Sequence, residues 1–203
     1  MDTRRKAIEQ TLSKVPSIPD PDPELEQYTT PAGLATDVLF EAFHLDDISG
    51  NLVIDMGTGT GILAIGAALM GAMPVYGFDV DEQAIAKARE AASRAGASQC
   101  TFEAMPVEEM AEFDADTVIS NPPFGAQQRH ADRAFVDAAA EVGDVCWTFH
   151  LTDTIDWVED RIADHGGEVT HKLRFAFPIP AQFHFHEKPR EEVDVTVARW
   201  ETG

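Results

Sequence analysis

Four consecutive residues near the middle of the chain, Asn121-Pro122-Pro123-Phe124, could hold an amine for reaction. Two adjacent prolines fix φ and supply no N–H, so they cannot lie inside a helix or a central strand. They predict a rigid exit from the apolar segment before them, with the Asn121 side-chain oxygen and the Pro122 carbonyl held as two acceptors. Phe124 would offer an aromatic face to a base that has left its stack.

This arrangement suits nucleophilic attack by a nitrogen. The exocyclic amine of adenine, like an amide, is a poor nucleophile because its lone pair is delocalised. Two acceptors on its N–H groups would favour a pyramidal nitrogen and direct the lone pair at an electrophilic carbon. Most of the rate would come from alignment and electrostatics, and no strong base is needed. The structural alternative is a proline-capped strand end beside a core phenylalanine.

A second motif, Asp55-Met56-Gly57-Thr58-Gly59-Thr60-Gly61, follows an apolar strand and opens a helix. Glycines let the backbone turn sharply and approach a ligand closely. Asp79 ends the next expected strand, where a carboxylate can bridge ribose hydroxyls. The acid at the start of the loop would repel a pyrophosphate but suits the sulfonium and ammonium of S-adenosylmethionine (SAM). We therefore expect SAM rather than a dinucleotide, and a tight turn without a ligand is the alternative.

Alternating apolar strands and helices from residue 51 onward would position both motifs. The expected strands cover 52–54, 74–78, 99–103, 116–120 and 144–149, and the expected helices cover 61–70, 82–95, 131–142 and 153–164. This alternation predicts a parallel sheet covered on both faces. Residues 168–177 and 192–200 alternate like two antiparallel strands. The fold class is therefore α/β and Rossmann-like: a mostly parallel, seven-stranded sheet with an antiparallel edge hairpin.

The N-terminal segment differs from the rest of the chain. Residues 3–14 are expected to form a short amphipathic helix with Ala7, Ile8 and Leu12 on one side. The four prolines of 16–23 exclude helix and central strand, which predicts a linker or an extended arm. Residues 31–43 then predict a helix with an apolar face.

The charge of the chain is unusual. Its 203 residues carry 36 Asp and Glu against 15 Lys and Arg, for a net charge of -21, and only five of the basic residues are Lys. The acids form no block. Their even spread and the scarcity of Lys favour a surface kept solvated in multimolar salt over a binder of cationic partners. Taken alone, the charge argues against nucleic-acid binding, because phosphate needs Lys and Arg.

Length and composition set further bounds. The length fits one domain, and 44% hydrophobic residues exclude wholesale disorder. We find no apolar run long enough to span a bilayer and no signal peptide. Two cysteines, Cys100 and Cys146, give neither a disulfide framework nor a zinc site, so we expect a reducing, cytoplasmic setting.

Together the motifs resemble the methyltransferase-like protein 5 family of class I SAM-dependent methyltransferases. The resemblance covers nearly the whole chain, from about residue 4 onward. The matching strings, in order, are Leu25-Glu26-Gln27-Tyr28-Thr29-Thr30-Pro31, Gly77-Phe78-Asp79-Val80-Asp81-Glu82, Asn121-Pro122-Pro123-Phe124-Gly125, Phe177-Pro178-Ile179-Pro180-Ala181 and Phe183-His184-Phe185-His186. That family methylates the N6 of one adenosine in small-subunit ribosomal RNA. Its members work with a small zinc-ribbon activator of the Trm112 type, which pairs edge-to-edge with the sheet.

The resemblance implies roles for individual residues. An N-terminal helix and arm over 1–30 would close over SAM, which the domain over 31–203 binds, and Asn121 to Phe124 would hold the target adenine. The implied cofactor-binding residues are Gln27, Tyr28, Thr30, Asp55, Gly57, Gly59, Thr60, Gly61, Ile62, Asp79, Val80, Met105 and Pro106. The family often has an Asp after the third strand. Here the stretch Ala104–Val107 has no acid, so recognition of the cofactor adenine is expected to rest on backbone and apolar contacts.

Basic residues gather beyond the catalytic motif and in the C-terminal hairpin. We expect Arg129, Arg133, His184 and Lys188 to contact RNA, and ordinary solvated surface is the alternative for each. The histidines do not suggest a metal, because they have neither a Glu-x-x-His helix nor a cysteine partner.

Two other functions stay open. The same fold could methylate a different nitrogen, such as glutamine N5 of a release factor or guanine N2 in RNA, although the chain has no added tRNA-binding domain. Alternatively, the chain could be a SAM-binding ribosome assembly factor without catalysis.

Overall fold

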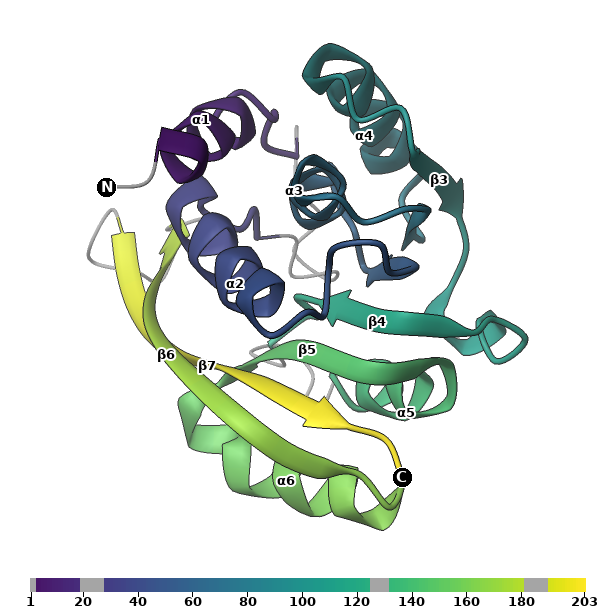
Figure 1. The fold of residues 1–203 in the computed structure, drawn as a ribbon. Coiled ribbons are helices and arrows are strands. Elements are labelled where there is room, and N and C mark those ends of the chain that lie inside the picture. The colour runs from purple at the N-terminus through teal and green to yellow at the C-terminus, as the bar shows by residue number, and fades with distance from the viewer. Residues whose placement is uncertain (1–2, 19–27, 125–131, 181–189) are drawn as a thin grey trace.

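A single seven-stranded sheet runs through the described part of the chain, with strand order β3-β2-β1-β4-β5-β7-β6 (Figure 1). The structure, a computed structural model, describes residues 3–18, 28–124, 132–180 and 190–203. The strands are β1 (Val53–Met56), β2 (Val75–Asp79), β3 (Cys100–Ala104), β4 (Ala115–Ser120), β5 (Gly143–Leu151), β6 (Glu168–Pro180) and β7 (Arg190–Glu201). β1 to β5 pair in parallel, and β7 pairs antiparallel with both β5 and β6. The expected α/β fold with its antiparallel edge hairpin is confirmed.

Helices cover both faces of this sheet. The helices are α1 (Thr3–Leu12), α2 (Ala32–His44), α3 (Ile62–Met70), α4 (Glu82–Ala95), α5 (Arg133–Val142) and α6 (Ile155–Asp164), with short 3₁₀ turns η2 (Val107–Glu109) and η3 (Thr152–Thr154). Figure 1 shows α1 to α4 on one side of the sheet and α5 and α6 on the other. Successive side chains of a strand point to opposite sides of the sheet, so Val53 packs with the α1–α4 layer and Ile54 with the α5–α6 layer.

Element boundaries differ from expectation where pairing overrides the apolar pattern. β1 continues to Met56, because Asp55 is paired with both Gly77 of β2 and Ile119 of β4. β5 extends to Leu151, since its residues from Val145 to Leu151 pair with β7. In α1, Ile8 and Leu12 are buried as expected, but Ala7 is exposed, which corrects its assignment to the apolar side.

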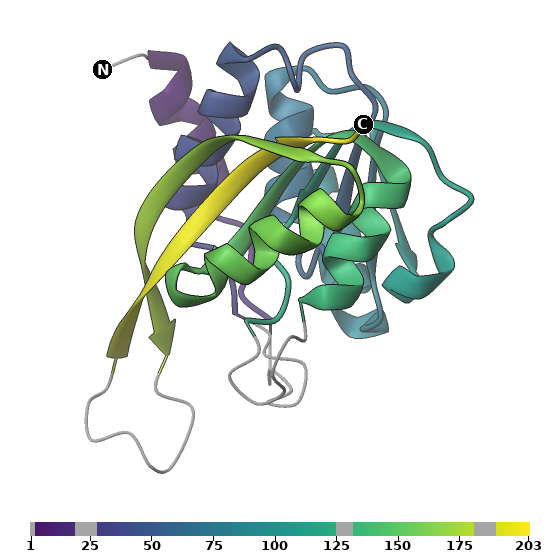
Figure 2. The same cartoon turned by 90° about the horizontal axis from the view of Figure 1, so that it is seen from below.

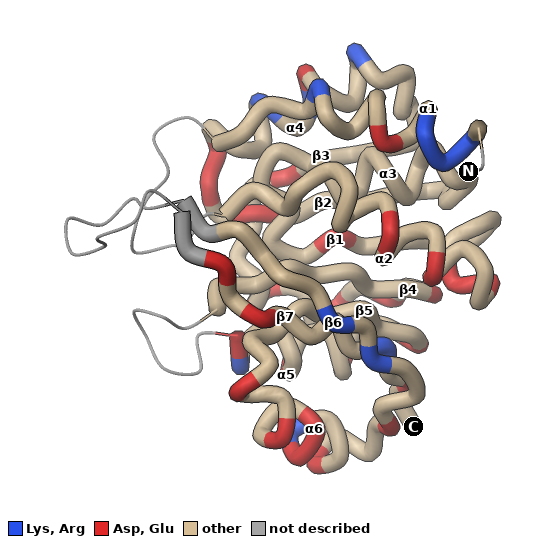
Figure 3. Tube along the Cα trace, turned by 90° about the vertical axis from the view of Figure 1, so that its left-hand side faces the viewer, with Lys and Arg blue, Asp and Glu red and all other residues tan. Residues whose placement is uncertain are grey.

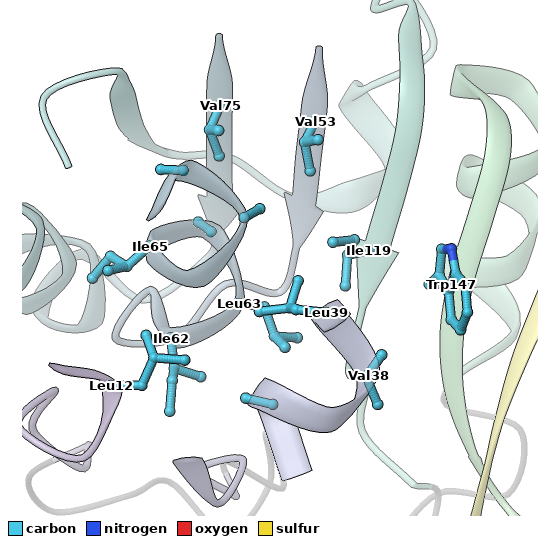
Figure 4. Packing of buried hydrophobic residues seen from close by; sticks show 14 of the residues in the cluster. Leu12, Val38, Leu39, Val53, Ile62, Leu63, Ile65, Val75, Ile119 and Trp147 are labelled. Carbon is cyan, nitrogen blue, oxygen red and sulfur yellow. The ribbon is translucent and has the colours of Figure 1, made fainter. Parts of the chain in front are cut away.

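The N-terminal helix is part of the core. Ile8 and Leu12 of α1 belong to the same buried cluster as residues of α2 and α3 (Figure 4). Gly66 of α3 makes this close packing possible, because an added Cβ would overlap Leu39 Cδ1 of α2 and lie 3.2 Å from Leu12 Cδ1. The three helices therefore place the segment after α1 beside the carboxyl ends of the strands.

A buried ion pair links strands at the other end of the sheet, where the parallel strands begin. Asp47, in the turn before β1, accepts from Arg199 Nε at 2.7 Å and Nη2 at 2.9 Å, and from Trp147 Nε1 at 2.9 Å. These contacts join the start of β1 to β5 and β7. The far end of β6 and the start of β7 project beyond the rest of the sheet (Figure 2). Within the described ranges, no helix has both the length and the apolar character to cross a bilayer.

We predict that Gly66→Ala destabilises the protein by about 1–3 kcal/mol, because overpacking against Leu39 and Leu12 outweighs the gain of about 1 kcal/mol that Ala usually brings to a helix. Gly33→Ala in α2 is the matched control, since its Cβ would meet only Glu9 Oε1 at 3.5 Å. Urea unfolding of both variants measures the difference. Equal stabilisation by the two substitutions would contradict the packing described here.

Candidate active site

A cavity of about 230 Å³ opens at the carboxyl ends of β1 to β4. It lies where the chain order of the strands reverses, between β1 and β4, which is where α/β sheets commonly bind ligands. Residues from both sequence motifs meet there. Of the predicted site residues, those lining the cavity are Tyr28, Thr30, Gly57, Gly59, Thr60, Ile62, Asp79, Val80, Met105, Asn121, Pro122, Pro123 and Phe124.

The glycine loop turns over the end of β2. Gly57, Gly59 and Gly61 all have positive φ, at 70°, 53° and 85°. A side chain would be strained in this conformation, and at Gly61 it would also press on Phe102 at 3.1 Å. The N–H groups of Gly57 and Thr58 both donate to the Phe78 carbonyl at 2.9 Å. The loop backbone therefore forms a fixed wall of the cavity.

The Asp55 side chain fixes this loop by hydrogen bonds. Its Oδ2 accepts from Thr58 Oγ1 at 2.7 Å and from the Ala64 N–H at 3.0 Å. Its Oδ1 is buried and has no hydrogen-bond partner among the described residues. Burial raises the pKa of Asp55 to about 7. Asp55, Gly61 and Pro106 do not line the cavity, although the sequence placed them among the cofactor-binding residues. The observed contacts of Asp55 fix the loop to the start of α3.

Asp79 reaches the cavity from the end of β2. Its Oδ2 accepts from the Gly59 N–H at 2.8 Å, and its Oδ1 accepts from the Asp81 N–H at 3.0 Å. Burial raises the pKa of this carboxyl above its ordinary value. The two hydrogen bonds fix the plane of the carboxylate beside the glycine loop.

Asn121 is fixed by a residue far away in the sequence. Its Nδ2 donates to Thr30 Oγ1 at 2.9 Å, across a separation of 91 residues. Its Oδ1 is buried and has no partner among the described residues. One end of the amide is thus held by Thr30, and the other is an acceptor with unused capacity in a residue that lines the cavity. Pro122 and Pro123 continue the same wall.

Phe124 is less open than the sequence led us to expect. The ring is 6% exposed and stacks on Tyr28 with centroids 6.1 Å apart, and Phe177 of β6 makes an edge contact at 5.4 Å. Phe124 therefore belongs to an aromatic cluster that joins the N-terminal segment, the catalytic motif and the C-terminal hairpin. A base in the cavity would meet the part of this cluster that lines it, Tyr28 and Phe124.

A buried acid–histidine pair anchors the chain beyond the catalytic motif. His150 Nδ1 lies 2.9 Å from Asp132 Oδ2, and His150 Nε2 lies 2.7 Å from Thr148 Oγ1. The pair joins the residue before α5 to the end of β5. Phe135, one turn into α5, is thereby held against Gly57, where an added Cβ would lie 3.0 Å from its ring. Nothing in the sequence pattern pointed to this pair.

Several lining residues were not predicted. They are Ile18, Thr29, Thr58, Leu63, Phe78, Val107, Glu108, Met110 and Phe135. Thr58 sits within the glycine motif and Glu108 is the first acid after β3, so both carried a usable signal, whereas the apolar residues resemble ordinary core. Arg133 lies on α5, 3.6 Å from Asp137, and does not line the cavity. Gln27, Arg129, His184 and Lys188 lie outside the described residues.

We predict that Asp55→Asn removes a component of the pH dependence of stability. The carboxyl has a higher pKa in the folded chain than its ordinary value of 3.8. The folded state therefore holds the proton more tightly, and the free energy of unfolding falls as the pH rises from about 4 to about 7. Asparagine has no such proton. Relative to wild type, the variant should gain on the order of 1 kcal/mol per pH unit across this interval and level off above it.

Urea unfolding of both proteins at several pH values between about 5 and 8 measures this difference. Parallel stability curves for the variant and the wild type would show that the Asp55 carboxyl does not titrate in this range.

Comparison with known proteins places this site in a family. The sequence model of ribosomal protein L11 methyltransferase (PrmA) matches residues 35–122, which hold the glycine loop, Asp79 and Asn121. An uncharacterized protein of Methanocaldococcus jannaschii, MJ0284, is 40% identical over 98% of this chain and 94% of its own length. The crystal structure of PH1948 from Pyrococcus horikoshii, reported as a candidate RNA methyltransferase, superposes with a TM-score of 0.92 at 38% identity, covering 100% of this chain and 99% of that one.

The rRNA N6-adenosine methyltransferase METTL5 of the zebrafish Danio rerio is 30% identical over 96% of this chain and 97% of its own length. The METTL5 protein of Drosophila melanogaster is 29% identical over 98% of this chain. Both matches extend over nearly the whole of this chain. The chain therefore belongs to the METTL5 family of rRNA N6-adenosine methyltransferases.

Proposed function

We propose that this chain transfers the methyl group of SAM to the N6 amine of an adenosine in small-subunit ribosomal RNA. The observation that carries the proposal is the Asn121 amide: Thr30 holds its nitrogen, and its oxygen is buried without a partner in a residue that lines the cavity. A buried acceptor normally has a partner. An N–H of the target amine would supply it.

The residues around Asn121 suit an adenine. The Pro122 carbonyl would be the second acceptor, and Pro123 keeps the strand exit rigid. Tyr28 and Phe124 line the same cavity and present aromatic surface for a flipped base. The described part of the site supplies alignment of the amine rather than a strong base beside it, which agrees with methyl transfer to a weakly basic nitrogen.

The other end of the cavity suits SAM. Gly57 and Gly59 line the cavity and leave space for a ligand close to the backbone, and Asp79 offers its remaining lone pairs to the ribose hydroxyls. Above about pH 7, where the Asp55 carboxyl is mostly ionised, it would add negative charge beneath the loop. SAM would supply an electrophilic methyl on a sulfonium, and the residues of this chain would hold it in line with the amine.

Two further parts of the proposal concern binding partners. We expect RNA to meet the cavity mouth near Arg133 and the segments of the chain that carry Arg129, His184 and Lys188. We also expect a Trm112-type activator to pair with a sheet edge, and the described edge strands β3 and β6 each have one side without a strand partner. Because the proposed substrate belongs to the ribosome, we expect the chain to work in the cytoplasm.

A second substrate class is favoured by one observation. The match to ribosomal protein L11 methyltransferase spans the catalytic core, and that enzyme modifies a protein. Incubating the purified chain with labelled SAM and ribosomal subunits, with and without a Trm112-type protein, separates the two. Label recovered from the RNA as N6-methyladenosine supports our proposal. Label confined to protein would favour the second class, and label in neither fraction would favour a noncatalytic assembly factor.

We predict that Asn121→Ala lowers the rate of transfer by about 100-fold or more while SAM affinity stays near the wild-type value, since alignment of the amine is lost. Thr30→Val should lower the rate by about fivefold, because one hydrogen bond worth about 1 kcal/mol no longer orients the amide. Thr30→Ser keeps the hydroxyl and is the matched control. Single-turnover rates and direct SAM binding measure the effects, and equal rates for the Val and Ser variants would contradict this role of Thr30.

We also propose that the acidity reflects a high-salt setting. The acids spread over helices and strand ends instead of forming one patch (Figure 3). In dilute buffer a net charge of -21 should destabilise the fold by self-repulsion. At about 1 M salt the Debye length falls to about 3 Å, so this repulsion is screened. We predict a higher unfolding temperature in multimolar KCl than in dilute buffer. An unchanged unfolding temperature would contradict a high-salt setting.

A further inference from the structure

The end of the cavity near β3 contains a carboxylate that neither the motifs nor the family resemblance assigned. Glu108, in the η2 turn after β3, lines the cavity together with Met105 and Val107. Its side chain is exposed and makes no hydrogen bond or ion pair with any other described residue. It is therefore an acceptor with unused capacity at a ligand cavity.

The order of the strands indicates which part of SAM would lie at this end. The Asn121 wall follows β4, the glycine loop follows β1, Asp79 ends β2, and the η2 turn follows β3. These four strands are neighbours in the order β3-β2-β1-β4. SAM is a linear molecule in which the ribose joins the sulfonium to the adenine. With the methyl group at Asn121 and the ribose at Asp79, the adenine would lie beyond β2, next to η2.

The surroundings of this end suit a flat aromatic ring. Val80 is 53% exposed, which is unusual for a large hydrophobic residue in this structure, and it lines the cavity next to Asp79. Met105 and Val107 add partly buried apolar surface. An adenine between these side chains would remove them from water.

The 6-amino group of adenine donates hydrogen bonds and needs an acceptor. The backbone nearby is largely engaged: the Met105 N–H donates to the Asp79 carbonyl, and the Pro106 and Val107 carbonyls accept from Glu109 and Met110. Asp79 receives two N–H groups at the ribose position. Glu108 is thus the side chain at this end with an uncommitted acceptor.

We propose that the Glu108 carboxylate binds the 6-amino group of the cofactor adenine and so selects an adenine nucleoside. This inference rests on the proposed use of SAM and replaces the expectation that adenine recognition uses backbone and apolar contacts alone. In this chain the acid would come from η2, because β3 ends at Ala104 and the next three residues, 105–107, include no acid.

Calorimetric binding of S-adenosylhomocysteine and of its analogue with unsubstituted purine in place of adenine tests the proposal. The wild type should prefer the adenine compound by about tenfold, the value of one hydrogen bond to a charged group at an exposed site. Glu108→Ala should bind both compounds equally, with affinity for the purine analogue unchanged. Glu108→Gln keeps an acceptor oxygen and should retain part of the preference.

Glu109→Ala is the matched control, because Glu109 is the adjacent exposed acid and does not line the cavity. It should keep the full preference of the wild type. An undiminished preference in Glu108→Ala, or an equal loss in Glu109→Ala, would overturn the role of Glu108 and leave the methyltransferase proposal intact. Failure of the wild type to bind S-adenosylhomocysteine at all would instead overturn both.

Discussion

The hydrogen bond between Thr30 and Asn121 is the contact on which the proposed chemistry depends. It fixes the amide at 2.9 Å from the Thr30 hydroxyl and leaves the carbonyl end of Asn121 for a substrate. Two features position its partners. The prolines stiffen the exit from β4, which carries Asn121. Helix α1 packs on α2 and α3 and so brings the N-terminal segment to the strand ends. The catalytic amide is thus held in place by two parts of the chain that are far apart in sequence.

The two ends of the sheet differ in how their buried polar groups are hydrogen-bonded. At the amino ends of the parallel strands, Asp47, Arg199 and Trp147 form a buried network in which every carboxylate oxygen of Asp47 has a donor. At the carboxyl ends, Asp55 and Asn121 each keep a buried oxygen without a partner among the described residues. Satisfied polar groups stabilise one end of the fold, and at the other end the free oxygen of Asn121, which lines the cavity, can accept from a ligand.

Much of this was predictable from local sequence. Apolar strands, the helix over 82–95 and the two motifs follow from periodicity, glycine and proline, which act through nearby backbone. The rest depends on contacts between distant segments. Stacking of Tyr28 on Phe124, the Asp132–His150 pair and the contact of Gly66 with Leu39 appear only once the elements pack. Glu108 lies four residues beyond the end of β3, and only the η2 turn brings it to the cavity.

We infer that Asn121 of this chain aligns an adenosine amine of small-subunit rRNA. The most direct measurement is a map of N6-methyladenosine in that RNA from cells that carry the wild-type gene, the Asn121→Ala variant at equal protein level, or no gene. If Asn121 has this role, the first strain contains one modified adenosine and the other two contain none. Full modification in the Asn121→Ala strain would contradict it.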